Sequence, residues 1–163
     1  MDWITRSGVG YDIHRLKPGR RLVLGGVEIP HPRGLDGHSD ADVVAHAIGD
    51  ALLGSLALGD LGKHFPPGDP RYKDISSLEL LRRIVALVRG RGAFITGVDV
   101  TVVAESPELA PHLAEMRARL ASALGIEVEQ LSVKATTNEG LGDIGRGEAM
   151  AAHAIATVRH PLA

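Results

Sequence analysis

Three residues near the amino-terminal end have the types and spacing of a metal site. Asp12 and His14 end a run, Gly8 to His14, that alternates like a β-strand, so their side chains share a face. His46 lies in a segment, Asp40 to Leu58, with the spacing of an amphipathic helix. One carboxylate and two imidazoles are a common ligand set for zinc, and three protein ligands leave a position open for a substrate. The alternative is that both histidines are ordinary polar residues at element edges.

Two further segments have the chemistry of anion binding. His38 and Ser39 precede the predicted helix, where free N–H groups and the helix dipole favour a phosphate, although simple capping by Ser39 also explains the pair. Lys134 to Glu139 leaves a predicted strand and enters a glycine-rich stretch, Gly140 to Gly147. Hydroxyl and N–H groups there can cradle phosphate oxygens, and Glu139 can hold a cation such as Mg²⁺. The spacing of a P-loop is absent, and a solvated glycine loop is the alternative.

A long loop, Gly59 to Tyr72, carries Asp60, Gly62 and Asp69. Its aspartates can accept hydrogen bonds from sugar hydroxyls, whereas turn formation is their commoner use. Together with the metal triad and the two anion-binding turns, this loop indicates phosphoryl chemistry on a small polar substrate. A metal would polarise a phosphoryl oxygen and orient the attacking group.

The elements that must position these residues follow from periodicity. In the first strand, Val9, Tyr11 and Ile13 alternate with small or polar residues and are predicted to face the core. Ser39 is predicted to cap the helix that carries His46. The segment Glu148 to Arg159 is ambiguous, because its alanines favour a helix while its apolar residues alternate as in a strand. The other predicted elements are a hairpin at Arg21 to Ile29 around Gly25-Gly26, helices at Ser76 to Arg89 (with a capping box, Ser76 to Glu79) and Pro111 to Gly125, and strands at Gly97 to Ala104 and Leu131 to Thr136.

Composition narrows the class of protein. The 163 residues suit one domain, and 44% hydrophobic residues suffice for a core. The formal net charge of -2 without a basic block argues against nucleic acid as a partner. No apolar run approaches the roughly 18 residues of a membrane span. The absence of cysteine and of a signal-peptide pattern favours the cytoplasm.

Read together, these segments resemble one family, 2-C-methyl-D-erythritol 2,4-cyclodiphosphate synthase, over about Gly8 to Val158. The motifs that carry the resemblance are Gly10-Tyr-Asp-Ile-His14, Gly25-Gly26, His38-Ser-Asp-Ala-Asp-Val-Val-Ala-His46, Asp50-Ala-Leu-Leu-Gly54, Ala57-Leu-Gly-Asp-Leu-Gly62, Phe65-Pro66, Asp99-Val-Thr101, Lys134-Ala-Thr-Thr137 and Gly145-Arg-Gly-Glu148.

The resemblance implies an α/β fold and an activity. The fold would be a four-stranded sheet with helices on one face and a small hairpin, and residues 1–163 would form a single catalytic domain. Three subunits would pack through their sheets, with active sites between neighbours, and Glu148 to Arg159 would be a strand. The activity would be a phosphorus–oxygen lyase of the non-mevalonate isoprenoid pathway. It would cyclise 4-diphosphocytidyl-2-C-methyl-D-erythritol 2-phosphate and release CMP.

The resemblance also implies roles for individual residues. Asp12, His14 and His46 would bind one zinc per subunit, and Glu139 would help to hold Mg²⁺ or Mn²⁺ at the substrate diphosphate. His38 and Thr137 would stabilise the transition state. The other substrate-binding residues would be Ser39 and Thr136 for phosphates, Asp60, Gly62, Phe65 and Asp69 for the sugar, Ala104, Pro107, Leu109 and Ala110 for the cytosine, and Arg146 near the trimer axis.

The chain departs from the family pattern at three positions. Glu108 stands where lysine is frequent beside the cytosine, Pro67 where an acidic residue is frequent in the sugar loop, and Asp143 where an aromatic residue is common. Two other functions fit the same residues: a phosphoesterase with zinc hydroxide as nucleophile, and a nucleotide- or prenyl-phosphate-binding protein with structural zinc.

Overall fold

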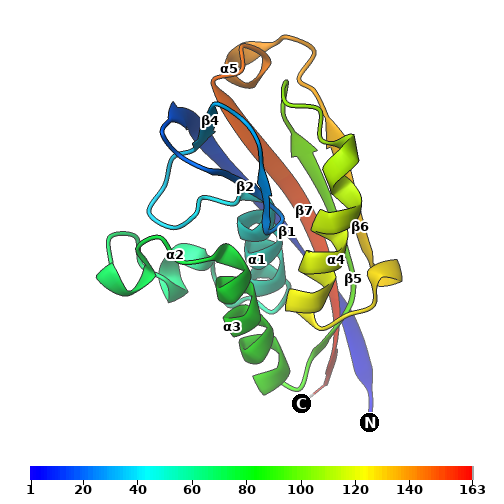
Figure 1. The fold of residues 1–163 in the computed structure, drawn as a ribbon. Coiled ribbons are helices and arrows are strands. Elements are labelled where there is room, and N and C mark those ends of the chain that lie inside the picture. Colours follow the sequence, from blue (N-terminus) through cyan, green and yellow to red (C-terminus); the bar gives the residue numbers. More distant parts are fainter. Residues whose placement is uncertain (163) are drawn as a thin grey trace.

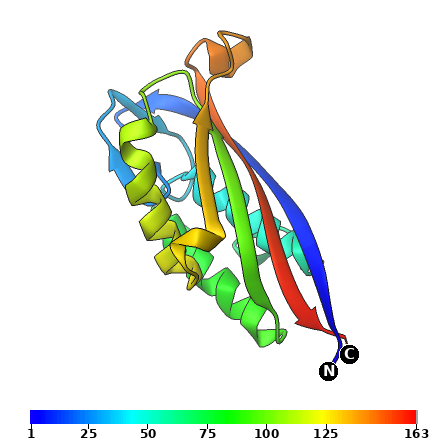
Figure 2. The ribbon, with the colours of Figure 1, turned by 90° about the vertical axis from the view of Figure 1, so that its right-hand side faces the viewer.

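The computed structural model describes residues 1–162, which form a twisted sheet covered by helices on one face (Figures 1 and 2). The sheet has five strands in the order β4-β1-β7-β5-β6, and all neighbours are antiparallel except β5 and β6. The strands are β1 (Trp3–Pro18), β4 (Arg33–Leu35), β5 (Phe94–Val103), β6 (Leu131–Thr136) and β7 (Ala149–Pro161). The four long strands that were predicted are present, and the three-residue β4 extends the sheet beyond β1 within a segment predicted as a loop.

Three helices pack on the sheet and enclose an aliphatic core. They are α1 (Val43–Ser55), α3 (Ser77–Gly90) and α4 (Leu113–Leu124). The centre of the core is α1, whose apolar side chains are buried on nearly every side, so no separate apolar stripe can be drawn on it. Two four-residue helices, α2 (Leu61–His64) and α5 (Gly142–Gly145), and three 3-10 turns, η1 (Pro70–Tyr72), η2 (Ala110–His112) and η3 (Val128–Gln130), complete the order.

The inward face of β1 is the small and polar one, which corrects the predicted orientation of this strand. A Cβ on Gly10 would lie 1.8 Å from the carbonyl oxygen of Ala47, so the backbone of α1 sits directly against the strand. Val9, Tyr11 and Ile13, predicted to face the core, are exposed in the isolated chain. The close approach of the helix needs glycine on the inner face, and this need overrides the apolar alternation that the prediction relied on.

The hairpin of β2 (Leu22–Leu24) and β3 (Val27–Ile29) is present as predicted, and it helps to fix the start of α1. Gly25 and Gly26 turn with positive φ and donate their N–H groups to the two carboxylate oxygens of Asp42. Asp42 also accepts from the N–H groups of Val44 and Ala45, so it is the N-cap of α1. Burial and the neighbouring Asp40 carboxylate raise the pKa of Asp42 to about 6, against the opposing effect of these N–H donors.

Two predicted capping interactions are not made by the side chains that the sequence suggested. The cap of α1 is Asp42 rather than Ser39, and Ser76 makes no side-chain capping bond to α3. Instead, Asp40 accepts the N–H of Ser77, the first residue of α3, at 3.0 Å. At α3 a residue distant in sequence thus takes over the bond that the local pattern assigned to Ser76, whereas at α1 the cap lies three residues after the predicted one.

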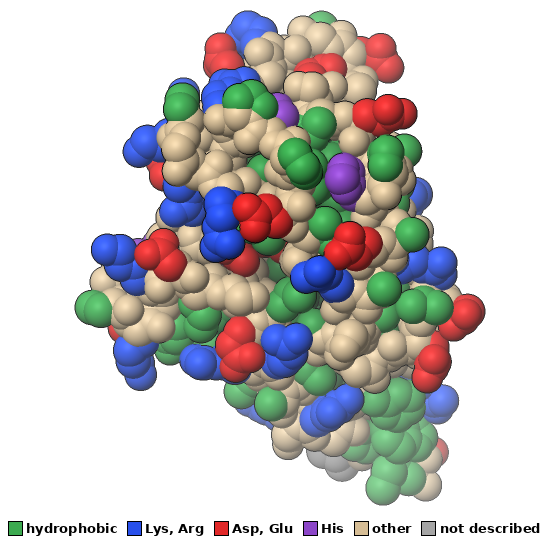
Figure 3. Space-filling view, in the orientation of Figure 1, with side chains coloured by type: hydrophobic (Ala, Val, Ile, Leu, Met, Phe, Trp, Pro, Cys, Tyr) green, Lys and Arg blue, Asp and Glu red, His purple; other side chains and the backbone are tan. Residues whose placement is uncertain are grey.

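Hydrophobic side chains gather at the end of the molecule where the termini lie (Figure 3). Trp3 and Phe94 stack edge-to-face there, and the guanidinium of Arg159 lies over both rings. On the uncovered sheet face, Val9 is 74% exposed and its partner across the ladder, Ile155, is 53% exposed. Among the helices of residues 1–162, none is long and apolar enough to cross a membrane.

Candidate metal centre and substrate cavity

The predicted metal triad converges. Asp12 and His14 project from the inner face of β1 toward α1, which carries His46. Oδ2 of Asp12 lies 3.1 Å from Nε2 of His14 and 3.0 Å from Nδ1 of His46. One donor atom from each residue lies within 4.8 Å of the other two. The donor set and its compactness fit one divalent cation, and each side chain is partly rather than fully buried, so the site remains open to a ligand.

In each imidazole, the ring nitrogen that faces away from Asp12 already has a hydrogen-bond partner. The other ring nitrogen, Nε2 in His14 and Nδ1 in His46, faces Asp12 and can bind a metal. Nδ1 of His14 donates to the carbonyl oxygen of Asp36 at 2.6 Å, because a carbonyl can only accept. Nε2 of His46 lies 2.8 Å from the hydroxyl of Ser77 and 3.2 Å from that of Ser39. Partners of this kind orient metal-binding histidines.

The electrostatics of the triad suit a cation. Burial tends to raise the pKa of the Asp12 carboxyl, but the hydrogen bonds from His14 and His46 outweigh it and lower that pKa to about 2. Burial likewise tends to lower the pKa of His14, and the Asp12 carboxylate overcomes this effect, so the pKa of His14 is raised above 6.5. The carboxylate is therefore ionised across the physiological range and attracts positive charge, whether it is a proton or a metal ion.

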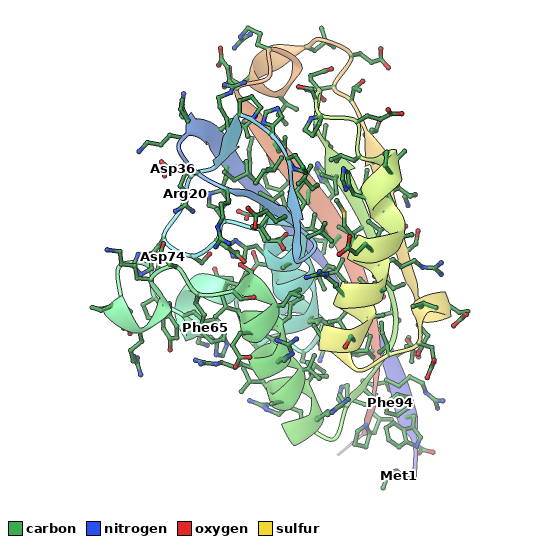
Figure 4. The ribbon with its side chains drawn as sticks, viewed as in Figure 1. Met1, Arg20, Asp36, Phe65, Asp74 and Phe94 are labelled. Carbon is green, nitrogen blue, oxygen red and sulfur yellow. The ribbon has the colours of Figure 1, made fainter. Side chains whose placement is uncertain are left out.

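A cavity of about 240 Å³ opens beside the triad. Gly62 and Phe65, predicted to touch a sugar, line it together with His38 and Ser39. Figure 4 shows Phe65 near α2, below the loop that carries Asp36. Pro67, which the sequence analysis placed in the sugar loop, also lines it, and the wall includes three residues that were not assigned to the site: Leu61, Tyr72 and Leu80. In the sequence, Tyr72 is the end of a loop and Leu80 has the pattern of a core position. An apolar cavity wall has the same local pattern as a core, so the sequence does not distinguish them.

The loop with His38 and Ser39 is held between two other loops. Nε2 of His38 lies 2.8 Å from the carbonyl oxygen of Asp69, and the carbonyl of His38 accepts the N–H of Asp74 at 2.8 Å. Arg20 donates to the carbonyl of Ser39 at 2.8 Å and lies 3.8 Å from the Asp74 carboxylate (Figure 4). The phosphate-binding candidates are thus fixed before any ligand arrives.

The two aspartates predicted for the sugar pocket are otherwise occupied in the isolated chain. Asp60 is the N-cap of α2 and accepts the N–H of Lys63 at 3.0 Å. The carboxylate of Asp69 pairs with Arg71 at 2.7 Å, and this hydrogen bond lowers the pKa of Asp69. Neither residue lines the cavity, whereas Asp50 does, and its pKa is raised by burial.

The second predicted anion-binding segment forms a separate cluster. Ala104 donates its N–H to the carbonyl of Thr136 at 3.0 Å, and the Thr137 hydroxyl accepts the N–H of Glu139 at 3.2 Å. Glu105 accepts N–H groups from Asn138 and Gly140 and so holds the turn. None of the predicted residues of this segment lines the cavity of its own chain.

The remaining predicted contacts lie near this second cluster or at the end of the sheet. Pro107 follows a cis peptide bond, Leu109 is buried and Ala110 begins η2. Arg146 pairs with Asp143, one of the departures from the family pattern, and lies 3.4 Å from Glu148. A positively charged group and two carboxylates therefore stand together at the glycine-rich turn.

Comparison with known proteins agrees with this arrangement. The model of the YgbB family matches residues 5–159. Over 150 residues, and 92% of each chain, the protein is 63% identical to the 2-C-methyl-D-erythritol 2,4-cyclodiphosphate synthase of Gloeobacter violaceus. It is 59% identical to the synthase of Syntrophomonas wolfei, covering 94% of this chain and 98% of that one.

Solved structures give the same result. The bifunctional IspDF of Campylobacter jejuni superposes with a TM-score of 0.94 at 38% identity, covering 98% of this chain and 43% of that one. A CDP-bound 2C-methyl-D-erythritol-2,4-cyclodiphosphate synthase superposes with a TM-score of 0.85 at 36% identity, covering 93% and 98%. Family model, sequence identity and fold agree over nearly the whole chain. The chain therefore belongs to the YgbB family of 2-C-methyl-D-erythritol 2,4-cyclodiphosphate synthases.

Proposed function

We propose that the chain is a metal-dependent phosphorus–oxygen lyase of the non-mevalonate isoprenoid pathway. It converts 4-diphosphocytidyl-2-C-methyl-D-erythritol 2-phosphate to 2-C-methyl-D-erythritol 2,4-cyclodiphosphate and CMP. The observation that carries the proposal is the convergence of Asp12, His14 and His46 at the edge of a cavity with polar and apolar walls. The names of the closely similar relatives support the same reaction.

The reaction needs positioning and charge neutralisation more than a protein nucleophile. An oxygen of the substrate's 2-phosphate attacks the β-phosphorus, and the bond from that phosphorus to the bridging oxygen breaks, so CMP leaves with that oxygen. Asp12, His14 and His46 would hold one zinc ion per subunit, which supplies positive charge against a phosphate oxygen. Glu139 would hold Mg²⁺ or Mn²⁺ together with the diphosphate.

The other residues bind and orient the substrate. Ser39 is well placed for a phosphate, because its oxygen accepts the N–H of Ala41 and faces Nε2 of His46, which leaves its proton free to donate. His38 and Thr137 would stabilise the charge that develops in the transition state, and Thr136 would hold a phosphate. Gly62 and Phe65, together with Asp60 and Asp69, would receive the methylerythritol, and Ala104, Pro107, Leu109 and Ala110 the cytosine.

We further propose a homotrimer with one active site at each subunit boundary. The separation of Thr136, Thr137 and Glu139 from the cavity of their own chain supports this assembly, because a neighbouring subunit can bring its own copy of that cluster to the cavity. The exposed apolar residues of β1 and β7 supply a face on which sheets can pack. Residues 1–163 would act as one catalytic domain, with a small-molecule substrate, in the cytoplasm.

Phosphorus NMR of the products tests the reaction. Incubation with the cytidyl substrate, zinc and Mg²⁺ should give CMP and a cyclic diphosphate without orthophosphate. A linear product or free phosphate would contradict the lyase and favour a phosphoesterase. Water labelled with oxygen-18 separates the two directly, because a hydrolase incorporates the label into the product and a cyclase does not.

A further inference from the structure

Behind the candidate metal centre, a buried serine contacts the ring of His46 on the side away from Asp12, and a carboxylate contacts that serine in turn. Ser77 is the first residue of α3 and is 1% exposed. Its hydroxyl lies 2.8 Å from Nε2 of His46 and contacts Oδ1 of Asp40 as well. Asp12 approaches the opposite nitrogen, Nδ1, at 3.0 Å. The four side chains therefore form one line from Asp40 to Asp12.

The chemistry of the donors sets the direction of every bond in this line. A carboxylate only accepts, so the single proton of the Ser77 hydroxyl goes to Asp40. The serine oxygen must then accept from His46, which places a proton on Nε2. With Nε2 protonated, a metal that replaces the proton shared between Nδ1 and Asp12 leaves a neutral ring whose Nδ1 lone pair points toward the predicted metal position.

We propose that Ser77 and Asp40 are positioning residues that fix the tautomer and the orientation of His46 for metal binding. The inference deepens the proposed function, since it concerns the same metal centre. Asp40 is itself held in place, because its N–H donates to the carbonyl of Ile75 at 3.1 Å and its carboxylate accepts the N–H groups of Ser77 and Asp42. The first residue of α3 thereby sets the orientation of the His46 ring on α1 relative to Asp12 on β1.

The contact of His46 with Ser39 is the weaker of its two hydroxyl contacts. It measures 3.2 Å, against 2.8 Å for Ser77. The oxygen of Ser39 also accepts the N–H of Ala41, so its lone pairs are shared. Loss of Ser77 therefore leaves the ring with one poorer partner and allows it to rotate or to change tautomer.

Zinc affinity of the purified full chain, measured by competition with a chelating dye at neutral pH, tests the inference. Ser77→Ala should weaken zinc binding roughly 10- to 100-fold, the usual effect of removing a partner of a metal-binding histidine. Ser76→Ala is the matched control, because Ser76 makes no side-chain capping bond, and it should stay within about threefold of the parent. Ser77→Ala within threefold of the parent would overturn the inference.

A second pair of variants separates the hydroxyl from the space that it fills. Ser77→Thr keeps the hydroxyl, and Ser77→Val has nearly the same shape as the threonine variant but lacks the hydroxyl. Thr should retain most of the zinc affinity and Val should lose as much as Ala, and the absorption spectrum of the cobalt-loaded Val variant should differ from that of the parent. Equal affinities for Thr and Val would contradict the role of the hydroxyl, even if the Ala variant failed to fold.

A double-mutant cycle tests Asp40. If Asp40 acts through Ser77, then Asp40→Asn should weaken zinc binding in the parent but add little in the Ser77→Ala background. If the effects of the two substitutions on zinc affinity multiply, Asp40 does not act through Ser77 and is removed from the proposal. A parent chain that takes up no zinc would overturn the proposed metal centre as well, whereas tight zinc binding that is indifferent to Ser77 would overturn this inference alone.

Discussion

At the scale of single residues, Asp12 is the side chain on which the site depends, because both imidazoles meet the same carboxylate oxygen. Burial by itself would favour the neutral form of Asp12, yet the hydrogen bonds from His14 and His46 lower its pKa to about 2. The negative charge is thus stabilised by groups that themselves bind metals when neutral. A cation that replaces the protons of these rings retains the attraction of the carboxylate.

Replacement of a metal ligand should abolish zinc uptake without unfolding the chain. His14→Ala should lose stoichiometric zinc and turnover, while its oligomeric state persists, since His14 is partly exposed and lies outside the main core. Metal analysis and light scattering measure the two effects. His112→Ala is the control, because its side chain makes no capping bond. Zinc retained at one per subunit in His14→Ala would contradict the assignment.

Zinc affinity should fall with acidity from near neutral pH. Burial lowers the pKa of His14, but the Asp12 carboxylate overcomes this effect and raises that pKa above 6.5. Because zinc needs the unprotonated nitrogen, protons compete below the raised pKa, and affinity drops about tenfold per pH unit for each proton displaced. Chelator competition between pH 5 and 8 measures the slope. A flat profile down to pH 5.5 would show that His14 binds no metal.

At the scale of elements, the decisive feature is the contact of β1 with α1, which brings the strand ligands to the helix ligand. Gly8 and Gly10 allow it, because a Cβ at either position would collide with carbonyl oxygens of α1. Apolar alternation predicted this strand but assigned the wrong face to the core. Periodicity identifies two faces of a strand, and it cannot by itself tell which face a helix covers and which is left for another chain.

Gly10→Ala should therefore destabilise the protein strongly. The added Cβ would lie 1.8 Å from the carbonyl of Ala47, so the helix must move, at a cost of more than about 3 kcal/mol. Gly90→Ala is the matched control, since Gly90 ends α3 with open space around it, and it should stabilise by about 0.5–1 kcal/mol. Urea unfolding measures both. Similar unfolding free energies for the two variants would contradict the close packing.

Sequence patterns predicted the helices, the hairpin and the strands at β1, β5 and β6 because each has a local signal. The pattern of β7 left helix and strand open, and only the family resemblance predicted a strand there. Sequence patterns failed where the determining partner is distant in sequence. The cap of α3 comes from Asp40, and the partner of His46 comes from Ser77, which reads as an ordinary serine at a helix start. The cavity wall formed by Tyr72 and Leu80 has the pattern of a core, so only three-dimensional proximity to the triad reveals it.

At the scale of the whole molecule, the uncovered sheet face is the feature that a single chain leaves unexplained. Val9 and Ile155 are paired neighbours on it, and both are largely exposed. In the proposed trimer this face is buried between subunits. Both faces of β7 are then covered, one by the helices of its own chain and the other by a neighbouring subunit. This explains the small and apolar residues of β7, which in the sequence left helix and strand open.

A charge placed on that face should break the assembly. Ile155→Glu should shift the protein from trimer to monomer and remove turnover, because the buried carboxylate would lack a partner. Leu87→Glu is the control, since Leu87 is exposed on α3 and should tolerate the change. Analytical ultracentrifugation gives the masses. A trimer that survives Ile155→Glu would exclude this face as the interface.

Mixing two inactive variants tests whether neighbouring subunits share a site. His46→Ala and Thr137→Ala should each be inactive alone. After unfolding and refolding together, mixed trimers contain sites with both residues intact, so activity should return to about a quarter of the parent value for a cyclic trimer. Absence of any recovery, with mixed trimers confirmed by mass, would place both residues in one subunit's site or in none.

The first and last strands carry the ends of the chain to the same place. Trp3 is the ladder partner of Pro161, and the N–H of Leu162 donates to the carbonyl of Asp2 at 2.9 Å. The strand ligands, Asp12 and His14, lie toward the other end of β1. A circular permutant that links the two ends through a short tether and opens at the Gly90–Gly92 bend would therefore keep every ligand in register, and an additional module spliced onto either end would extend away from the catalytic pocket.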